Sequence, residues 1–157
     1  MRIAIASDHA AVALKAALAD WLRAQGHEVD DLGTDGEASV DYPDFGYELA
    51  AHLAAGKAER GVALCGTGIG ISIAVNRHTE MRCALVSEPL SAALAREHND
   101  ANVLALGARL IGPEMAKACL AAFLATPFGE GRHAGRVGKL SGARAGQHQP
   151  ETRRDRD

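Results

Sequence analysis

The residues best suited to chemistry are a cysteine and the glycine-rich run that follows it, Cys65-Gly66-Thr67-Gly68-Ile69-Gly70. The apolar run that ends at Cys65 predicts a buried strand, and a short helix is expected to begin near Ile69 or Gly70. The backbone amides of such a loop can point at an anion or at a developing oxyanion. A position beside a helix N-terminus favours a thiolate, so Cys65 is a candidate base or nucleophile. The competing interpretation is a small buried residue that ends a strand.

Acid–base and anion-binding side chains occur elsewhere in the chain. His98 follows a stretch expected to be helical from Glu88. The carboxyl end of a helix favours a protonated imidazole, which suits a general acid or base. Asp8 follows the first expected strand, where capping a helix and contacting a ligand explain it equally well. Arg132 and Arg136 are four residues apart, so on a helix they could grip one phosphate, although pairs at this spacing are usually solvent-facing.

Two nucleotide-binding motifs can be compared with the glycine loop, and both fit poorly. A P-loop needs a Lys-Ser or Lys-Thr after its glycines, and none follows here. A dinucleotide fingerprint needs G-x-G-x-x-G after the first strand, whereas this G-x-G-x-G follows the third, with Ile71 in place of the last glycine. Glu88 lies about where a ribose-binding acid is expected, so a non-catalytic nucleotide-binding module stays an alternative.

The remaining cysteines bear on a third alternative, a thiol-based redox protein. Cys83 and Cys119 lack reactive neighbours in the sequence and are interpreted as core residues. No second cysteine lies near Cys65 to resolve an oxidised thiol, which counts against redox chemistry. With three cysteines far apart and no C-x-x-C, neither a disulfide framework nor a zinc site is expected.

Five short β-type runs alternate with helical stretches and must position these residues; they cover 3–6, 29–32, 62–65, 83–86 and 103–106. This alternation predicts an α/β three-layer sandwich with a five-stranded parallel sheet. Ligands bind at the carboxyl ends of such strands. The residues expected there are Ser7-Asp8-His9, the Cys65 loop, Ser87-Glu88 and Gly107-Ala108-Arg109.

Capping residues, prolines and glycines between these strands indicate where helices begin and end. Helices are expected from a cap at Asp8 to Gly26, from Pro43 to near Gly56, from about Glu88 to His98, and from Pro113 to about Ala125. From about 142 the composition turns to Gly, Gln, Pro and alternating charges, which bury too little apolar area to fold. We therefore expect one domain over 1–141 and a disordered tail over 142–157.

Composition excludes some classes of partner. The formal net charge is −3 and only 4% of residues are aromatic, so the basic and aromatic surface that binds nucleic acid is not evident. No apolar run approaches the roughly 18 residues that cross a bilayer. We expect a cytoplasmic protein with no nucleic-acid or membrane partner.

The motifs together resemble one family, ribose-5-phosphate isomerase B, which also includes allose-6-phosphate and galactose-6-phosphate isomerases. The resemblance extends from Arg2 to about Leu140, and its motifs occur in the family's order and spacing. They are Asp8-His9, Asp41-Tyr42-Pro43, the run from Cys65 to Ser72, Ser87-Glu88-Pro89, the run from His98 to Leu104, and Gly131-Arg132-His133.

This resemblance implies a metal-free and cofactor-free interconversion of ribose 5-phosphate and ribulose 5-phosphate, in the pentose phosphate pathway. It implies a Rossmann-like homodimer with active sites at the subunit interface; a tetramer and a hexose 6-phosphate substrate remain alternatives. By similarity, His98 helps to open the sugar ring, and the Cys65 thiolate moves a proton between C2 and C1 through an enediolate. Thr67 and the amides from Gly66 to Gly70 would steady that intermediate.

The same resemblance assigns the substrate contacts. Asp8, His9 and Asn99 would hold sugar hydroxyls, and Arg109, Arg132 and Arg136 would take the phosphate, partly from the neighbouring subunit. Two departures from the family pattern stand out. Ala10-Ala11 replaces a glycine that many members have after Asp-His-x, which bears on substrate choice. A branch without the cysteine uses a glutamate later in the loop, and that position here is Ile71.

Overall fold

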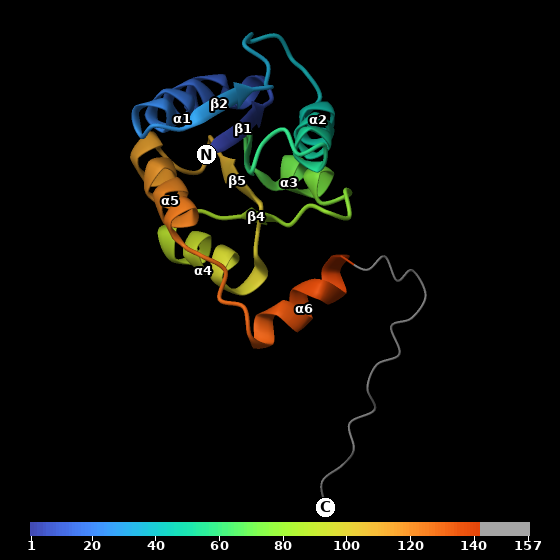
Figure 1. Cartoon of the computed structure of the whole chain (residues 1–157). Helices are drawn as coiled ribbons and strands as arrows, with labels where there is room; N and C mark the ends of the chain where they lie inside the picture. Colours follow the sequence, from blue (N-terminus) through green and yellow to red (C-terminus); the bar gives the residue numbers. More distant parts are fainter. Residues whose placement is uncertain (142–157) are drawn as a thin grey trace, which may run out of the picture.

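A computed structural model describes residues 1–141, in which five parallel strands form one sheet (Figure 1). The strands are β1 (Arg2–Ser7), β2 (Glu28–Asp31), β3 (Arg60–Cys65), β4 (Cys83–Leu85) and β5 (Val103–Gly107), in the order β2-β1-β3-β5-β4. The predicted five-stranded parallel sheet is confirmed. The chain leaves β1 toward one edge and later returns to its other side as β3, so the topological switch point lies between β1 and β3.

Helices cover both faces of this sheet, as the α/β sandwich prediction requires (Figure 1). Helices α1 (Val12–Ala24), α4 (Pro89–Asn99) and α5 (Pro113–Ala125) pack on one face, and α2 (Tyr42–Ala54) and α3 (Ile69–Val75) on the other. A short 3-10 helix, η1 (His9–Ala11), precedes α1. Asp8 caps this turn, accepting a hydrogen bond from the Ala10 amide at 3.0 Å, so α1 itself begins later than the capping prediction placed it.

The two faces of the sheet carry side chains of different size. In β1, Ile3 and Ile5 face α1 and α5, whereas Ala4 and Ala6 face α2 and α3. Strands β3 and β5 repeat the pattern, since leucines point to the first face and alanines to the second. Within the second helical layer, α2 and α3 approach closely: a Cβ on Gly46 of α2 would lie 2.8 Å from the Ala74 Cβ of α3. Cys65 ends β3 on this face of small side chains.

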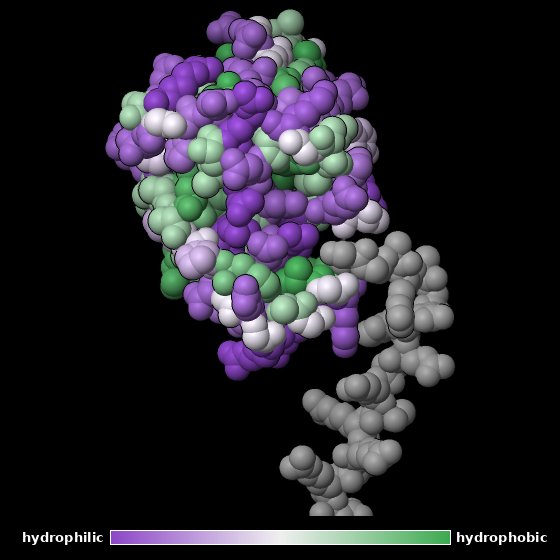
Figure 2. Space-filling model, in the orientation of Figure 1, coloured by the Kyte–Doolittle hydropathy of each residue, from purple (hydrophilic) through white to green (hydrophobic). Residues whose placement is uncertain are grey.

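The last described helix, α6 (Arg132–Ser141), packs mainly against α4 and lies apart from the sheet (Figure 1). Figure 2 shows hydrophobic residues on α6 where it borders the rest of the molecule. Leu140 there lines a cavity of about 510 Å³ together with Met81 and Asn99. The tail predicted over 142–157 lies outside the described residues. Within 1–141, no helix is long and apolar enough to span a membrane.

Candidate active site

The ends of β1 and β3 place the first group of predicted site residues side by side. Ser7 pairs with Leu64 in the register of the two strands, and the Asp8 amide donates to the Leu64 carbonyl at 3.2 Å. Asp8 is only 7% exposed and Cys65 only 5%. Open parallel sheets bind ligands at the carboxyl ends of the strands on either side of the topological switch point, which here are β1 and β3. The structure thus brings Asp8 and Cys65 together at the switch point.

Cys65 is held by the loop that it opens. Its Sγ accepts a hydrogen bond from the Gly68 amide at 3.1 Å. Gly68 has a φ of +74°, a left-handed conformation that turns its amide back toward the sulfur and starts α3. An amide donor on sulfur stabilises a thiolate, which is the form that can accept a proton from carbon.

The other two cysteines are poorly suited to that role. Burial raises the pKa of Cys83 to about 12 and also raises the pKa of Cys119. Cys119 is fully buried in the core, and Cys83 packs against the second hydrophobic cluster. Cys119 is confirmed as a core residue, whereas Cys83 is only partly buried, at the margin of the second cluster.

The glycine loop lies directly on the end of β5. A Cβ on Gly107 would lie 2.6 Å from the Thr67 carbonyl oxygen, a distance that no real side chain tolerates. The Thr67 hydroxyl accepts from the Ile69 amide at 3.3 Å, and Thr67 also lines a cavity of about 280 Å³ beside the loop. This loop is therefore positioned by backbone packing, and its predicted site residues Gly66, Thr67, Gly68, Ile69 and Gly70 form one unit.

Arg109 joins this edge as predicted. Its amide donates to the Gly66 carbonyl at 2.9 Å, and a Cβ on Gly66 would lie 3.2 Å from the Arg109 guanidinium carbon. The side chain therefore lies over the glycine. A guanidinium beside a row of loop amides adds a charged donor for an anionic group.

Tyr42 is a site neighbour to which the sequence patterns assigned no role. Its ring covers Gly70 so closely that a Cβ there would lie 2.6 Å from the phenol Cζ. The side chain begins α2 and remains 41% exposed. The sequence signal that could have pointed to Tyr42 is its position in Asp41-Tyr42-Pro43. This motif begins α2, and the fold brings the start of α2 to the glycine loop.

His9 is oriented by a distant segment of the chain. Its Nδ1 accepts a hydrogen bond from the Val40 amide at 3.1 Å. A neutral imidazole that accepts at Nδ1 carries its proton on Nε2, which leaves Nε2–H as a donor for a ligand. His9 thus offers one defined hydrogen-bond donor next to Asp8.

A second group of predicted residues gathers around the end of α4. The rings of His98 and His133 stack with centroids 4.5 Å apart and 10° between their planes. Burial lowers the pKa of His133, and repulsion from His98, Arg132 and Arg136 lowers it further. Both arginines lie on α6 four residues apart, as predicted, and both are exposed. This group is cationic and open to solvent.

The two groups lie at opposite edges of the sheet. Helix α4 starts where β4 ends and runs back, so His98 and Asn99 lie near the beginning of β5 at Val103, whereas Cys65 pairs with Gly107 at its end. Four residue steps of strand separate these edges by about 13 Å. Within one chain, the structure does not bring His98, Asn99, Arg132 and Arg136 to the Cys65 loop.

Glu88 serves a structural purpose that weakens the nucleotide alternative. Its carboxylate accepts from the Ser91 amide at 2.7 Å and from the Leu90 amide at 2.6 Å, which caps α4. The hydrogen bonds from Ser91, followed by that from Leu90, lower the pKa of this carboxyl group. A carboxylate committed to two helix amides is not free to hold a ribose. Among residues 1–141, no cluster of three or more His, Cys, Asp or Glu has a metal-binding arrangement.

Known proteins share the sequence pattern and fold of this chain. The model of the Ribose/Galactose Isomerase family matches residues 3–140. Ribose-5-phosphate isomerase B of Escherichia coli is 43% identical over 136 residues, which cover 87% of this chain and 91% of that protein. D-erythrulose-4-phosphate isomerase of Pectobacterium atrosepticum is 44% identical over 142 residues, covering 89% and 93%. The structure of Clostridium thermocellum ribose-5-phosphate isomerase B has a TM-score of 0.89 and 48% identity, covering 90% and 95%.

These similarities define the class first: the chain is an aldose–ketose isomerase that acts on a sugar phosphate. More particularly, it belongs to the Ribose/Galactose Isomerase family.

Proposed function

We propose that the protein interconverts ribose 5-phosphate and ribulose 5-phosphate, with Cys65 as the group that moves the carbon-bound proton. The observation that carries this proposal is the thiol of Cys65 at the switch point, its Sγ 3.1 Å from the Gly68 amide. Relatives named ribose-5-phosphate isomerase B, in Escherichia coli and Clostridium thermocellum, support the choice of substrate. The corresponding place in metabolism is the pentose phosphate pathway.

The proposed reaction needs a base, an oxyanion site and a proton return. The Cys65 thiolate takes the proton from C2 of the open-chain aldose, and the electron pair left on C2 forms the enediolate. The loop amides and the Thr67 hydroxyl hold the oxygen on which charge develops. The thiol proton exchanges with solvent before a proton is returned to C1, and a hydroxyl proton passes from O2 to O1, so the reaction is a net isomerisation that can leave a solvent-derived hydrogen on C1.

The second residue group enters this scheme from another copy of the chain. His98, Asn99, Arg132 and Arg136 lie about 13 Å or more from the loop of their own chain, judged by strand length. In a homodimer they would face the partner's loop, where His98 helps to open the ring and the arginines bind the phosphate. Exposed apolar side chains beside the loop support such a contact: Ile69 and Ile73 of α3 are 50% and 53% exposed, and Leu85 is 42% exposed.

The relatives are named for sugar phosphates with different numbers of carbon atoms. The Pectobacterium relative is named for a four-carbon sugar phosphate at 44% identity, so close similarity leaves the sugar open. The test is incubation with ribose 5-phosphate in D2O, which we expect to give ribulose 5-phosphate with deuterium on carbon. A panel containing erythrulose 4-phosphate, allose 6-phosphate and galactose 6-phosphate serves as the comparison. Turnover of one of these without turnover of ribose 5-phosphate would overturn the proposed substrate.

A further inference from the structure

Lys15 is a charged side chain buried inside the protein, on the first turn of α1. Its residue is 1% exposed, and its ammonium donates to Asp31 at 2.5 Å and to Asp35 at 2.8 Å. A buried ammonium is costly unless it is paired and hydrogen-bonded. Burial, the largest single cause, lowers the pKa of Lys15, but the hydrogen bonds and negative charges of the two aspartates together outweigh it, and the net pKa is raised. Lys15 is therefore a cation between two carboxylates.

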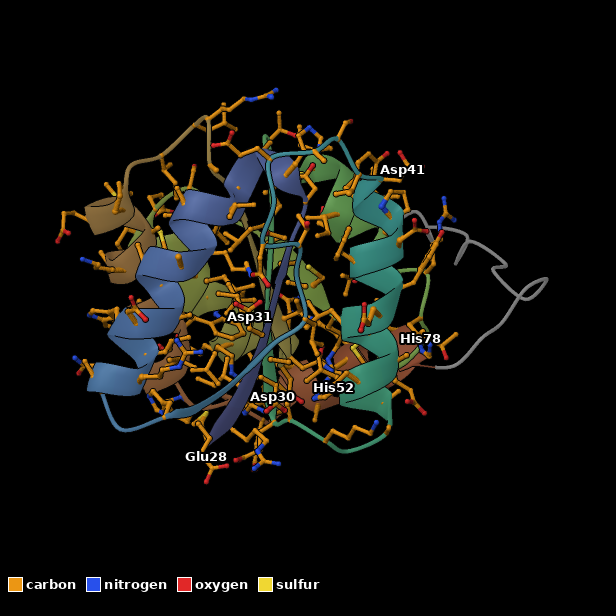
Figure 3. The ribbon with its side chains drawn as sticks, turned by 90° about the horizontal axis from the view of Figure 1, so that it is seen from above. Glu28, Asp30, Asp31, Asp41, His52 and His78 are labelled. Carbon is orange, nitrogen blue, oxygen red and sulfur yellow. The ribbon has the colours of Figure 1, made fainter. Side chains whose placement is uncertain are left out.

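The two aspartates belong to the segment 31–41, which leads from β2 to α2. Asp31 ends β2 and Asp41 precedes α2, and Figure 3 shows the chain between them crossing from the α1 side to the start of α2. The Thr34 amide donates to the Ser7 carbonyl at 3.2 Å. A Cβ on Gly33 would lie 2.9 Å from Cδ of Lys15 and would also contact the Ser7 amide. The segment thus packs on Lys15 and on the residue before Asp8.

The far end of this segment orients a candidate substrate contact. The Val40 amide donates to Nδ1 of His9 at 3.1 Å, which selects the tautomer with hydrogen on Nε2. The position of the Val40 amide depends on the conformation of the chain from Asp35 to Asp41. Asp35 anchors this stretch to the core, because its carboxylate contacts the buried Lys15 ammonium although its own side chain is 88% exposed.

We propose that Lys15 is a positioning residue for the isomerase: by holding Asp31 and Asp35 it fixes the segment 31–41, so that the Val40 amide keeps His9 in the tautomer that donates from Nε2 to the sugar phosphate. This inference rests on the proposed function in its last clause. Lys15 itself does not touch the substrate. Its effect reaches His9 through the segment 31–41, which lies outside the glycine loop.

The test replaces Lys15 by methionine, which keeps the length of the stem and removes the charge. The matched control is Lys117→Met, since Lys117 makes a comparable 2.8 Å ion pair with Glu114 on α5, away from the segment. Two readouts need no turnover: hydrogen exchange of the Val40 amide, and the ¹⁵N resonances of the His9 ring, which distinguish a protonated from an unprotonated nitrogen. Both are measured on the full chain without substrate.

In Lys15→Met we expect Val40 exchange to be about tenfold faster and the two His9 nitrogen resonances to converge as the tautomers mix, the equivalent of losing about one hydrogen bond. KM for ribose 5-phosphate should rise about fivefold to tenfold, and kcat should change less, because a hydroxyl or phosphate contact binds ground and transition states alike. Lys117→Met should match the parent protein in every readout.

Unchanged Val40 exchange and unchanged His9 resonances in folded Lys15→Met would overturn the proposal. If that variant does not fold, Asp35→Asn alone decides by the same readouts, because Asp31 still neutralises the buried ammonium and still accepts from the Gly33 amide at 3.1 Å. Lys15→Met could show faster Val40 exchange and converging His9 resonances while the parent protein has no isomerase activity. That result would support the link from Lys15 to His9 and refute the proposed reaction.

Discussion

The two edges of the sheet hold their functional residues in contrasting ways. At the Cys65 edge, glycines pack backbone against backbone, and the thiol is 5% exposed and hydrogen-bonded to the main chain. At the His98 edge, a stacked histidine pair and two exposed arginines are carried by α6, which packs mainly on α4. Proton transfer at carbon needs a fixed geometry, whereas phosphate binding tolerates long side chains. The contrast shows that the Cys65 edge is positioned by backbone packing, whereas the His98 edge depends on exposed side chains of one peripheral helix.

The largest effect should come from Cys65→Ala. Removing the proposed base should lower kcat by about 10²- to 10⁴-fold, the usual contribution of general base catalysis. The fold should persist, because alanines already line this face of the sheet. Steady-state kinetics and a thermal melt check both points, and Cys83→Ala is the matched control with retained activity. More than a few per cent of parental turnover in Cys65→Ala would move the base elsewhere.

The backbone packing of the first edge can be broken by Gly107→Ala. The new Cβ would lie 2.6 Å from the Thr67 carbonyl, so the loop must shift. A displacement of about 1 Å at catalytic groups can cost about 10² in rate. We expect a loss of kcat of that order, measured alongside Gly112→Ala, whose added Cβ would have no atom within 4 Å. Equal activity in the two variants would show that loop position is not critical.

The second edge can be tested by removing its charges. Arg136→Gln should raise KM for the sugar phosphate by about tenfold or more, since a hydrogen bond to a charged group contributes about 1.5–3 kcal/mol. A lysine control, Lys139→Gln on the same helix, should have little effect. A change in kcat alone, with KM unchanged, would contradict a binding role for Arg136.

Mixing two impaired variants tests whether two chains share one site. When equal amounts of Cys65→Ala and Arg132→Gln/Arg136→Gln subunits are refolded together and assayed well below the raised KM, half of the proposed homodimers are hybrids, and each hybrid has one intact shared site. We therefore expect about a quarter of parental activity to return. A mixture no more active than its components would mean that each site is formed within one chain.

The smallest expected effect is on a titration at the second edge. Arg132→Gln should raise the pKa of His133, because one of the cations that lower it is removed. The shift should be partial, since burial is the larger cause and remains. NMR titration of the His133 ring measures it. A pKa that falls further would show that Arg132 does not act on His133 through its charge.

Much of the fold was predictable from the sequence because its signals are local. Runs such as 62–65 and 103–106 are apolar throughout, as expected for strands covered on both faces, and each is found within a residue or two of its predicted bounds. Asp8 was less predictable: a capping residue was expected to begin α1 directly, and it instead caps a 3-10 turn. The choice between these two turns depends on packing against β3, which the sequence does not display.

The candidate site was predictable where a motif and the chain topology coincide, as at Cys65 and Arg109. Lys15 was not, because a lysine on a helix is expected to be solvated, and its burial depends on carboxylates 16 and 20 residues away. Tyr42 was missed as a site neighbour for a similar reason. Its contact with Gly70 exists only because α2 and α3 approach closely.

The small side chains on the α2 and α3 face have a consequence for redesign. On the face of the sheet that carries Cys65, Ala6, Ala63 and Ala105 lie side by side in the strand register, all fully buried. Alanine has no side-chain atoms beyond Cβ, so substitutions at these three positions cannot enlarge the site much. Space for a longer sugar has to come from the loops around the site. Directed evolution toward a new sugar should accordingly collect its substitutions in the surrounding loops and leave the strands unchanged.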